Sequence, residues 1–66
     1  MQLSVNGATH RLPPGTTLGG LLVRLDLAGK RLAVERNGDI VPRSRHADTL
    51  LEEGDRLEIV VAVGGG

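Results

Sequence analysis

The stretch that decides the fold is Leu57-Glu58-Ile59-Val60-Val61-Ala62-Val63, and Gly64-Gly65-Gly66 follows it directly. Alternate residues of an extended strand share one face. Here all the odd-numbered residues are apolar, so we expect them to face the core: Leu57, Ile59, Val61 and Val63. Val60 and Ala62 fall on the outward face, where a solvated strand normally carries charge. They are either ordinary exposed apolar residues or a patch for docking a partner. A strand so apolar belongs in the middle of a sheet, most simply parallel to the first strand.

A β-hairpin is predicted at the start of the chain. Leu3 and Val5 alternate with polar residues, which is typical of a half-buried strand. The Asn6-Gly7 pair that follows is the strongest two-residue hairpin signal. The second strand runs to about Leu12, and Pro13-Pro14-Gly15 ends it. His10 shares a face with Leu12; we interpret it as a partly buried edge-strand histidine, since it has no neighbouring acid or nucleophile.

One helix should follow the hairpin, with a leucine stripe at i, i+3, i+4 and i+7: Leu18, Leu21, Leu22 and Leu25. Either Thr16 or Thr17 can cap it. Gly19 and Gly20 cost about 1 kcal/mol each relative to alanine, so we expect close packing there. A phosphate-binding loop at these glycines would need a strand-loop-helix fingerprint that is absent. Gly29 is a candidate C-terminal cap.

Two short strands are predicted next, at residues 32–34 and 40–41, joined by a turn at Asn37-Gly38. Pro42 ends the second of them. Residues 43–51 form a loop with one short helical turn, in which Arg43, Arg45 and His46 make a small basic patch. That patch is either solvated or in contact with an acidic surface or phosphate of a partner. A turn at Glu53-Gly54-Asp55 then leads into the final strand.

This order of elements predicts an α+β fold of the β-grasp, or ubiquitin-like, type. A mixed sheet of four to five strands would be covered on one face by one main helix. We expect a single domain at residues 1–63 and a flexible glycine tail at residues 64–66.

Composition excludes several classes of function. The chain has 66 residues, eight Lys and Arg against eight Asp and Glu, and no cysteine or aromatic residue. Disulfides, thiolate catalysis and cysteine zinc sites are therefore impossible. Zero net charge and the lack of aromatic stacking platforms argue against nucleic acid or an anionic membrane as partner. With no signal pattern and no apolar run of about 20 residues, we expect a cytoplasmic protein, monomeric when free.

The tail suggests a chemistry of its own. Glycine has no side chain, so a glycine tail can enter a narrow channel, and three extended residues reach about 10 Å. The Gly66 carboxylate could thus enter a partner's active site. An α-carboxyl has a pKa of roughly 3.3–3.7, so at neutral pH it is a poor electrophile that must be activated, usually by adenylation with ATP. The chain has no phosphate-binding motif and no cysteine nucleophile, so we expect it to be a substrate and not an enzyme.

Several of these features together resemble a known family, the bacterial sulfur carrier proteins of thiamine thiazole biosynthesis, ThiS. The resemblance covers essentially the whole chain and rests on the Asn6-Gly7 hairpin, the run Ile40-Val41-Pro42-Arg43, the run 53–58 and the terminal glycines. Many members end in two glycines after another residue, whereas here Gly64 makes a third. This difference leaves the terminal chemistry intact and bears only on the fit of the tail.

The resemblance implies a mechanism and a set of partners. An adenylating enzyme of the ubiquitin-activating type would convert the Gly66 carboxylate to an acyl-adenylate, using ATP and magnesium that the enzyme holds; this chain would bind neither cofactor nor metal. A cysteine desulfurase would supply sulfur for a thiocarboxylate on Gly66, and thiazole synthase would accept that sulfur. The residues expected to contact these partners are Gly64, Gly65, Val60, Ala62, Glu58 and Arg43.

Three other functions stay open from the residues. The small subunit of molybdopterin synthase has the same tail chemistry, although its relatives are usually longer and carry aromatic residues. A ubiquitin-like modifier would instead form an isopeptide bond with a target lysine. A β-grasp interaction module would use its sheet surface alone, and loss of Gly65 and Gly66 would then have little effect.

Overall fold

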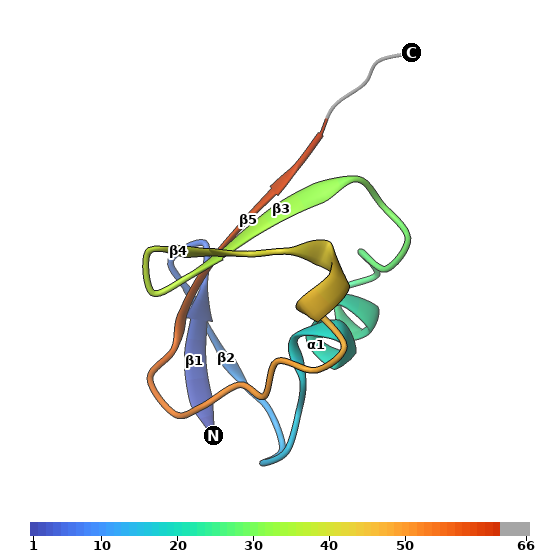
Figure 1. Ribbon diagram of the computed structural model, residues 1–66. Coiled ribbons are helices and arrows are strands. Elements are labelled where there is room, and N and C mark those ends of the chain that lie inside the picture. The colour runs from blue at the N-terminus through green and yellow to red at the C-terminus, as the bar shows by residue number, and fades with distance from the viewer. Residues whose placement is uncertain (63–66) are drawn as a thin grey trace.

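A computed structural model describes residues 1–62, which form a five-stranded mixed sheet with one α-helix packed on one face (Figure 1). The sheet order is β2-β1-β5-β3-β4. In chain order the elements are β1 (Gln2–Val5), β2 (Ala8–Arg11), α1 (Leu18–Arg24), β3 (Leu32–Arg36), β4 (Asp39–Val41), the 3-10 helix η1 (Arg43–Arg45) and β5 (Arg56–Val61). The predicted β-grasp fold is confirmed. The predicted domain boundary after residue 63 lies outside the described residues.

The last strand, β5, lies in the centre of the sheet as its apolar sequence predicts. It runs parallel to β1, with Ser4 opposite Arg56 and Val5 opposite Leu57. On its other side it runs antiparallel to β3 along the whole of β3, which pairs with residues 57–61 of β5. As far as Leu57, β5 has a neighbour on each side and no free edge, which protects that part of the strand from pairing with other chains.

Both predicted two-residue turns form. Asn6 and Gly7 have φ values of 50° and 82°, and Asn37 and Gly38 have φ values of 52° and 90°. Positive φ at both central residues matches the right-handed twist of the flanking strands, and Asn followed by Gly is the pair that tolerates it best. These turns fix the registers of β1 with β2 and of β3 with β4.

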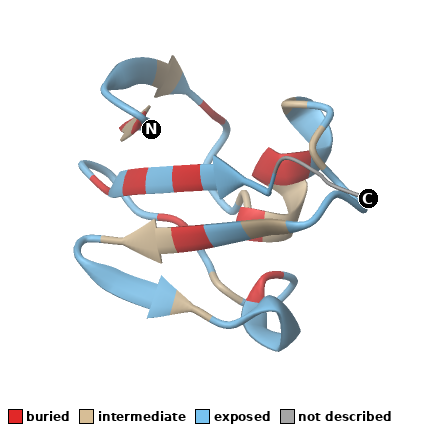
Figure 2. Cartoon of the chain, turned by 90° about the horizontal axis from the view of Figure 1, so that it is seen from above, coloured by how far each residue is buried: buried red, intermediate tan, exposed pale blue. Residues whose placement is uncertain are grey.

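The core lies between the helix and the inner face of the sheet. Three leucines of the predicted stripe, Leu18, Leu21 and Leu22, are buried, and Leu25 packs against them at the margin. The other buried apolar residues are Leu3, Val5, Leu12, Val34, Leu51, Leu57 and Ile59. Figure 2 shows buried and exposed residues alternating along the central strands, which is the period of a sheet covered on one side only.

The helix begins where the sequence indicates and ends earlier than predicted. Thr17 is the cap: its Oγ1 accepts a hydrogen bond of 3.1 Å from the amide of Gly20. The prediction of a cap at Gly29 is wrong, because α1 ends at Arg24 and the chain reverses at Asp26, which has a φ of 60°. Aspartate, with its short polar side chain, is among the few residues that tolerate this left-handed conformation. Gly29 lies in the next turn of the connection to β3.

The core face of β5 is shorter than predicted. Leu57 and Ile59 are buried, but Val61 is 37% exposed, so the core assignment of Val61 is wrong, and Val63 lies outside the described residues. The cause is the length of β1, which pairs with β5 only as far as Leu57. Beyond that point β5 has β3 on one side only, and it projects past the main body of the sheet (Figure 1).

Gly19 is the point of closest packing between α1 and the loop after η1. Its amide donates a 2.8 Å hydrogen bond to the carbonyl oxygen of His46. A Cβ at Gly19 would lie 3.3 Å from the Cα of Ala47, whereas a Cβ at Gly20 would meet only side-chain atoms, the nearest at 3.4 Å. The predicted reason for the glycines, close packing, therefore holds for Gly19.

We expect opposite outcomes for alanine at these two neighbouring positions. Gly20→Ala should raise the free energy of unfolding by about 0.5–1 kcal/mol, because alanine is the better helix former. Gly19→Ala should lose that gain, because backbone atoms of the loop must move to admit the methyl group. Thermal unfolding of the two variants and the wild type measures the difference. Equal stabilisation by both substitutions would contradict the packing explanation.

Candidate functional site: the outward face of β5

Three of the residues predicted to contact partners lie on the outward face of β5 and directly after it. Glu58, Val60 and Ala62 are all exposed, and Val60 is 67% exposed. Strand alternation causes this, because Leu57 and Ile59 between them point into the core. Gly64, Gly65 and Gly66 lie outside the described residues, so their predicted roles stay predictions.

Neighbouring strands add residues to this face that sequence reasoning missed. Ala33 of β3 lies directly opposite Val60, and Glu35 lies directly opposite Glu58. Ile40 of β4 pairs with Glu35 from the other side and is 74% exposed. We call Ala33, Ile40, Val60 and Ala62 the outer patch. It follows from the register between strands far apart in the sequence, which periodicity within one strand does not reveal.

Arg43 does not share this face. It is exposed at the start of η1 and lines a pocket on the helix side together with Gly19 and Leu22 of α1. The sheet therefore separates Arg43 from the outer patch. Its predicted contact with a partner would have to be made from the opposite side of the molecule.

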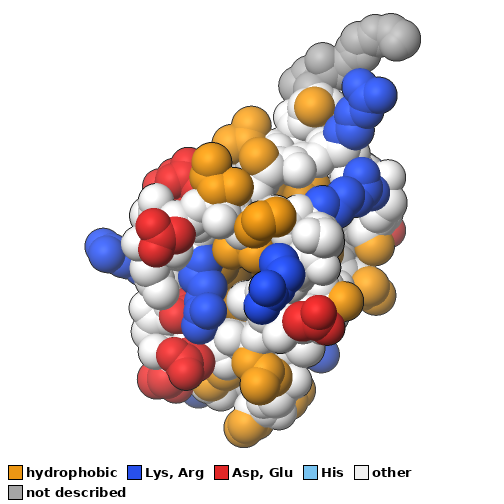
Figure 3. Space-filling model, viewed as in Figure 1, with side chains coloured by type: hydrophobic (Ala, Val, Ile, Leu, Met, Phe, Trp, Pro, Cys, Tyr) orange, Lys and Arg blue, Asp and Glu red, His pale blue; other side chains and the backbone are white. Residues whose placement is uncertain are grey.

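His46 is not part of a basic surface patch, contrary to the prediction. His46 is only 8% exposed, and its Nε2 lies 3.0 Å from the carbonyl oxygen of Val41. It joins the loop to the end of β4 and is not exposed with Arg43 and Arg45. His10 is half-buried on the edge strand β2, as expected. On the face shown in Figure 3, acidic and basic side chains are interspersed with hydrophobic ones and form no large block of one sign.

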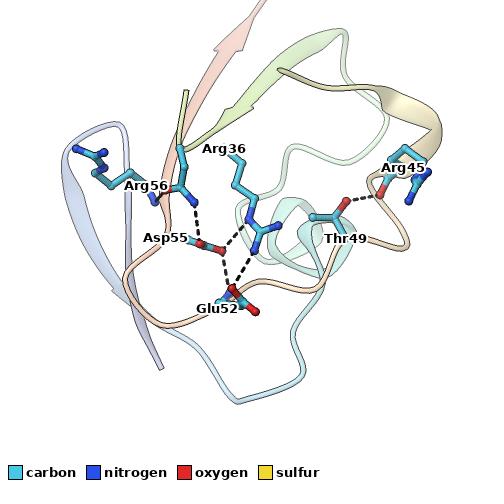
Figure 4. A network of polar contacts seen from close by, with 7 residues as sticks. Arg36, Arg45, Thr49, Glu52, Asp55 and Arg56 are labelled. Atoms are coloured by element: carbon cyan, nitrogen blue, oxygen red, sulfur yellow. Dashed lines mark hydrogen bonds and ion pairs between the residues drawn. The ribbon is translucent and has the colours of Figure 1, made fainter. Parts of the chain in front are cut away.

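The start of β5 is fixed by a buried carboxylate. Asp55 is 5% exposed and accepts hydrogen bonds from Arg36 Nε at 2.9 Å, from Asn37 Nδ2 at 3.0 Å and from the amide of Glu52 at 2.8 Å. Asn37 in turn accepts a 2.9 Å hydrogen bond from the amide of Arg56. Figure 4 shows the carboxylate at the centre of this network, which joins the end of β3 to the start of β5.

The environment of Asp55 lowers the pKa of its carboxyl group. Burial alone raises that pKa, since the charged form loses water. The hydrogen bonds from Glu52, Asn37 and Arg36, together with the charge of Arg36, act in the opposite direction and prevail. Asp55 is therefore ionised at neutral pH, and its charge is satisfied within the fold.

A second side chain holds the middle of β5. The amide group of Asn6 accepts a 2.8 Å hydrogen bond from the backbone N–H of Ile59 and donates a 3.0 Å bond to its carbonyl oxygen. Asn6 thus makes the two hydrogen bonds to the backbone of Ile59 that a further residue of β1 would make if that strand were longer. Strand β5 is held from Asp55 to Ile59, and the exposed residues Val60 and Ala62 follow immediately.

Within residues 1–62, no cluster of three or more His, Asp or Glu side chains is placed to bind a metal ion. The described helices include none with the length and apolarity to span a membrane.

Comparison with known proteins identifies the family. A family model, described as the ThiS family, matches residues 3–66. The chain belongs to the ThiS family. It is 37% identical over 65 residues to the sulfur carrier protein ThiS of Bacillus subtilis, a match that covers 97% of this chain and 98% of that protein. The crystal structure of the thiamine biosynthesis protein ThiS from Geobacter metallireducens superposes with a TM-score of 0.83, at 30% identity, over the full length of both chains.

A second kind of ThiS-family relative is much longer. The thiazole synthase of Magnetococcus marinus is 42% identical to this chain over all 66 residues, but the match covers only 20% of that protein. The chain thus spans about a fifth of the length of this relative. A ThiS-like region therefore occurs both as a protein of this size and as part of a thiazole synthase.

Replacement of Asp55 by asparagine should destabilise the fold in a pH-dependent way. The amide presents one acceptor oxygen where the carboxylate presents two, so we expect a loss of about 2 kcal/mol at neutral pH. The folded pKa of Asp55 lies below its ordinary value of about 3.9, so its contribution is fully present above that value and is lost as the pH falls through the folded pKa. The wild type should therefore lose its advantage over Asp55→Asn below about pH 4.

Glu52→Gln is the matched control for this experiment. Glu52 pairs with Arg36 at 3.6 Å in the same network, but its side chain is 78% exposed, so its loss should cost little. Urea unfolding at a series of pH values measures both variants. A difference between Asp55→Asn and the wild type that stays constant from pH 7 to acid would contradict the role assigned to the ionised carboxylate.

Proposed function

We propose that this protein is a sulfur carrier of thiamine thiazole biosynthesis and acts as a protein co-substrate, not as an enzyme. The observation that carries the proposal is the ThiS-family match through residue 66, where the sequence has three consecutive glycines after the central strand. The curated relative of the same length, from Bacillus subtilis, is named for this role.

The reaction sequence follows from carboxylate chemistry. An adenylating enzyme would convert the Gly66 carboxylate to an acyl-adenylate, with ATP and magnesium held by that enzyme. The terminal sulfur of a desulfurase persulfide would displace AMP, and cleavage of the S–S bond by a thiol would leave a thiocarboxylate on Gly66. Transfer of this sulfur to thiazole synthase, with an oxygen atom from water or from the acceptor replacing it on the Gly66 carbonyl carbon, would regenerate the carboxylate. Because ATP is required, we place the protein in the cytoplasm.

The contribution of the chain itself is to position the residues that would contact the partner. Asp55 and Asn6 hold β5 as far as Ile59, so Val60 and Ala62 are presented from a fixed strand. The outer patch and Glu58 would dock the partner, and Gly64 and Gly65 would pass through a channel that admits no side chain. Arg43 would make a separate contact from the helix side of the sheet.

The long relatives support thiazole synthase as a partner. In the Magnetococcus marinus protein, a region similar to this entire chain belongs to the same polypeptide as the thiazole synthase. Such a connection keeps a carrier near its acceptor at high effective concentration. We infer that the present protein, as the carrier, docks on a separate thiazole synthase.

The mass of the protein tests the proposed chemistry. Incubation with ATP, an adenylating enzyme and a sulfur source should add the mass difference between one sulfur and one oxygen atom, as measured by intact-mass spectrometry. A variant truncated after Gly64 should not gain this mass, and its circular dichroism and Tm should match the wild type, because residues 1–62 contain the folded core. A mass gain in the truncated variant would contradict Gly66 as the site of transfer.

The outer patch can be tested with two valines of nearly equal exposure. Val60→Gln should weaken sulfur transfer to thiazole synthase about tenfold, because a polar side chain would be buried against the partner. Val23→Gln, on the exposed side of α1 at 65% exposure, should leave transfer unchanged. Neither substitution should change the free energy of unfolding by more than about 0.5 kcal/mol, since both sites are exposed. Equal transfer rates for the two variants would count against docking through the outer patch.

A further inference from the structure

Two carboxylates of equal charge lie directly opposite one another on the outward face of the sheet. Glu35 of β3 and Glu58 of β5 are paired in the antiparallel register, and Glu35 is half-buried. Residues directly opposite in such a pair have Cβ atoms about 4.5–5.5 Å apart, so like charges there destabilise the sheet. Within residues 1–62, no Lys, Arg or His lies within 4 Å of either carboxylate.

The arginine on the same face of β5, Arg56, does not neutralise the pair. Arg56 lines a hollow together with Glu35, Glu58, Asn37 and Gly38, yet it forms no ion pair with either glutamate. Arg36, the residue after Glu35, belongs to the other face, where it binds Asp55. The chain thus gives an ion pair to the carboxylate that fixes β5 and none to the two on the outward face.

The surroundings of the pair are apolar on two sides. Ala33 and Val60 form the next pair along the two strands, toward the end of β5. Ile40 lies beside Glu35 on β4. Carboxylates placed among exposed aliphatic side chains become much stronger acceptors once a partner covers the face and excludes water. Locally unfavourable contacts that contribute nothing to the stability of the fold are typical of functional surfaces.

We propose that Glu35 and Glu58 together receive one arginine or lysine side chain of thiazole synthase, while the outer patch packs against apolar residues around that cation. The inference rests on the proposed function and adds the chemistry of the docking site. A planar guanidinium can bind two carboxylates at once, which the paired geometry favours. The hollow of about 140 Å³ suits one side-chain head group and is too small for a nucleotide.

This arrangement predicts that the same substitution makes the free protein more stable and the complex weaker. In Glu35→Gln/Glu58→Gln the repulsion is gone, so Tm should rise by about 1–8 °C. The dissociation constant for thiazole synthase from the same genome, measured by titration calorimetry with the 66-residue chain, should increase at least about tenfold. The salt dependence of binding should be smaller in the variant than in the wild type.

Asp26→Asn/Asp48→Asn is the matched control, because it removes the same net charge from exposed sites away from the outer patch, and asparagine tolerates the positive φ of Asp26. It should bind thiazole synthase as the wild type does. Equal affinity of Glu35→Gln/Glu58→Gln and the wild type, or no binding by the wild type, would overturn the inference. A gain of sulfur mass on Gly66 in the wild type would show that the proposed carrier function stands even then.

Discussion

The structure depends on how the last strand is held. Strand β5 must enter the middle of the sheet after four other strands, parallel to one neighbour and antiparallel to the other. Backbone ladders supply most of its hydrogen bonds, but at each end of the shared segment a side chain takes the place of a missing strand residue. Asn37, itself held by Asp55, does so at Arg56 by accepting a hydrogen bond from its backbone N–H, and Asn6 does so at Ile59. Both side chains lie in or beside turns, where the backbone has just left its ladder.

Asn6 and Asp55 illustrate what the sequence can and cannot predict. The sequence predicts a turn at Asn6, because Asn followed by Gly is a local signal that depends on no other part of the chain. Its second role, bonding Ile59, joins residues 53 positions apart and has no local signature. The sequence likewise predicts that Asp55 is part of a turn. Its burial follows from Arg36 and Asn37, which only the pairing of β3 with β5 brings near.

The same distinction applies to the candidate site. Alternation along one strand was enough to place Glu58, Val60 and Ala62 on the outward face. Their neighbours Ala33, Glu35 and Ile40 belong to other strands, and a shift of one residue in register would turn them to the opposite face. The end of α1 was misplaced for a related reason: Gly29 is the usual choice for a cap, but Asp26 reaches the left-handed conformation first. The core assignment of Val61 was wrong because the sequence does not reveal where β1 stops pairing.

A small domain has little stability to lose, since a chain of this size buries only about 60% of its unfolded surface. A cross-strand pair of like charges costs about 0.2–1 kcal/mol. Hydrogen bonds to a charged group, such as those of Asp55, contribute about 1.5–3 kcal/mol each. Asp55 lies three residues before Glu58 on the same segment, so the strand that carries the repulsion is also fixed at its start by this network. The fold can therefore keep an unfavourable pair on its outward face without losing the position of β5.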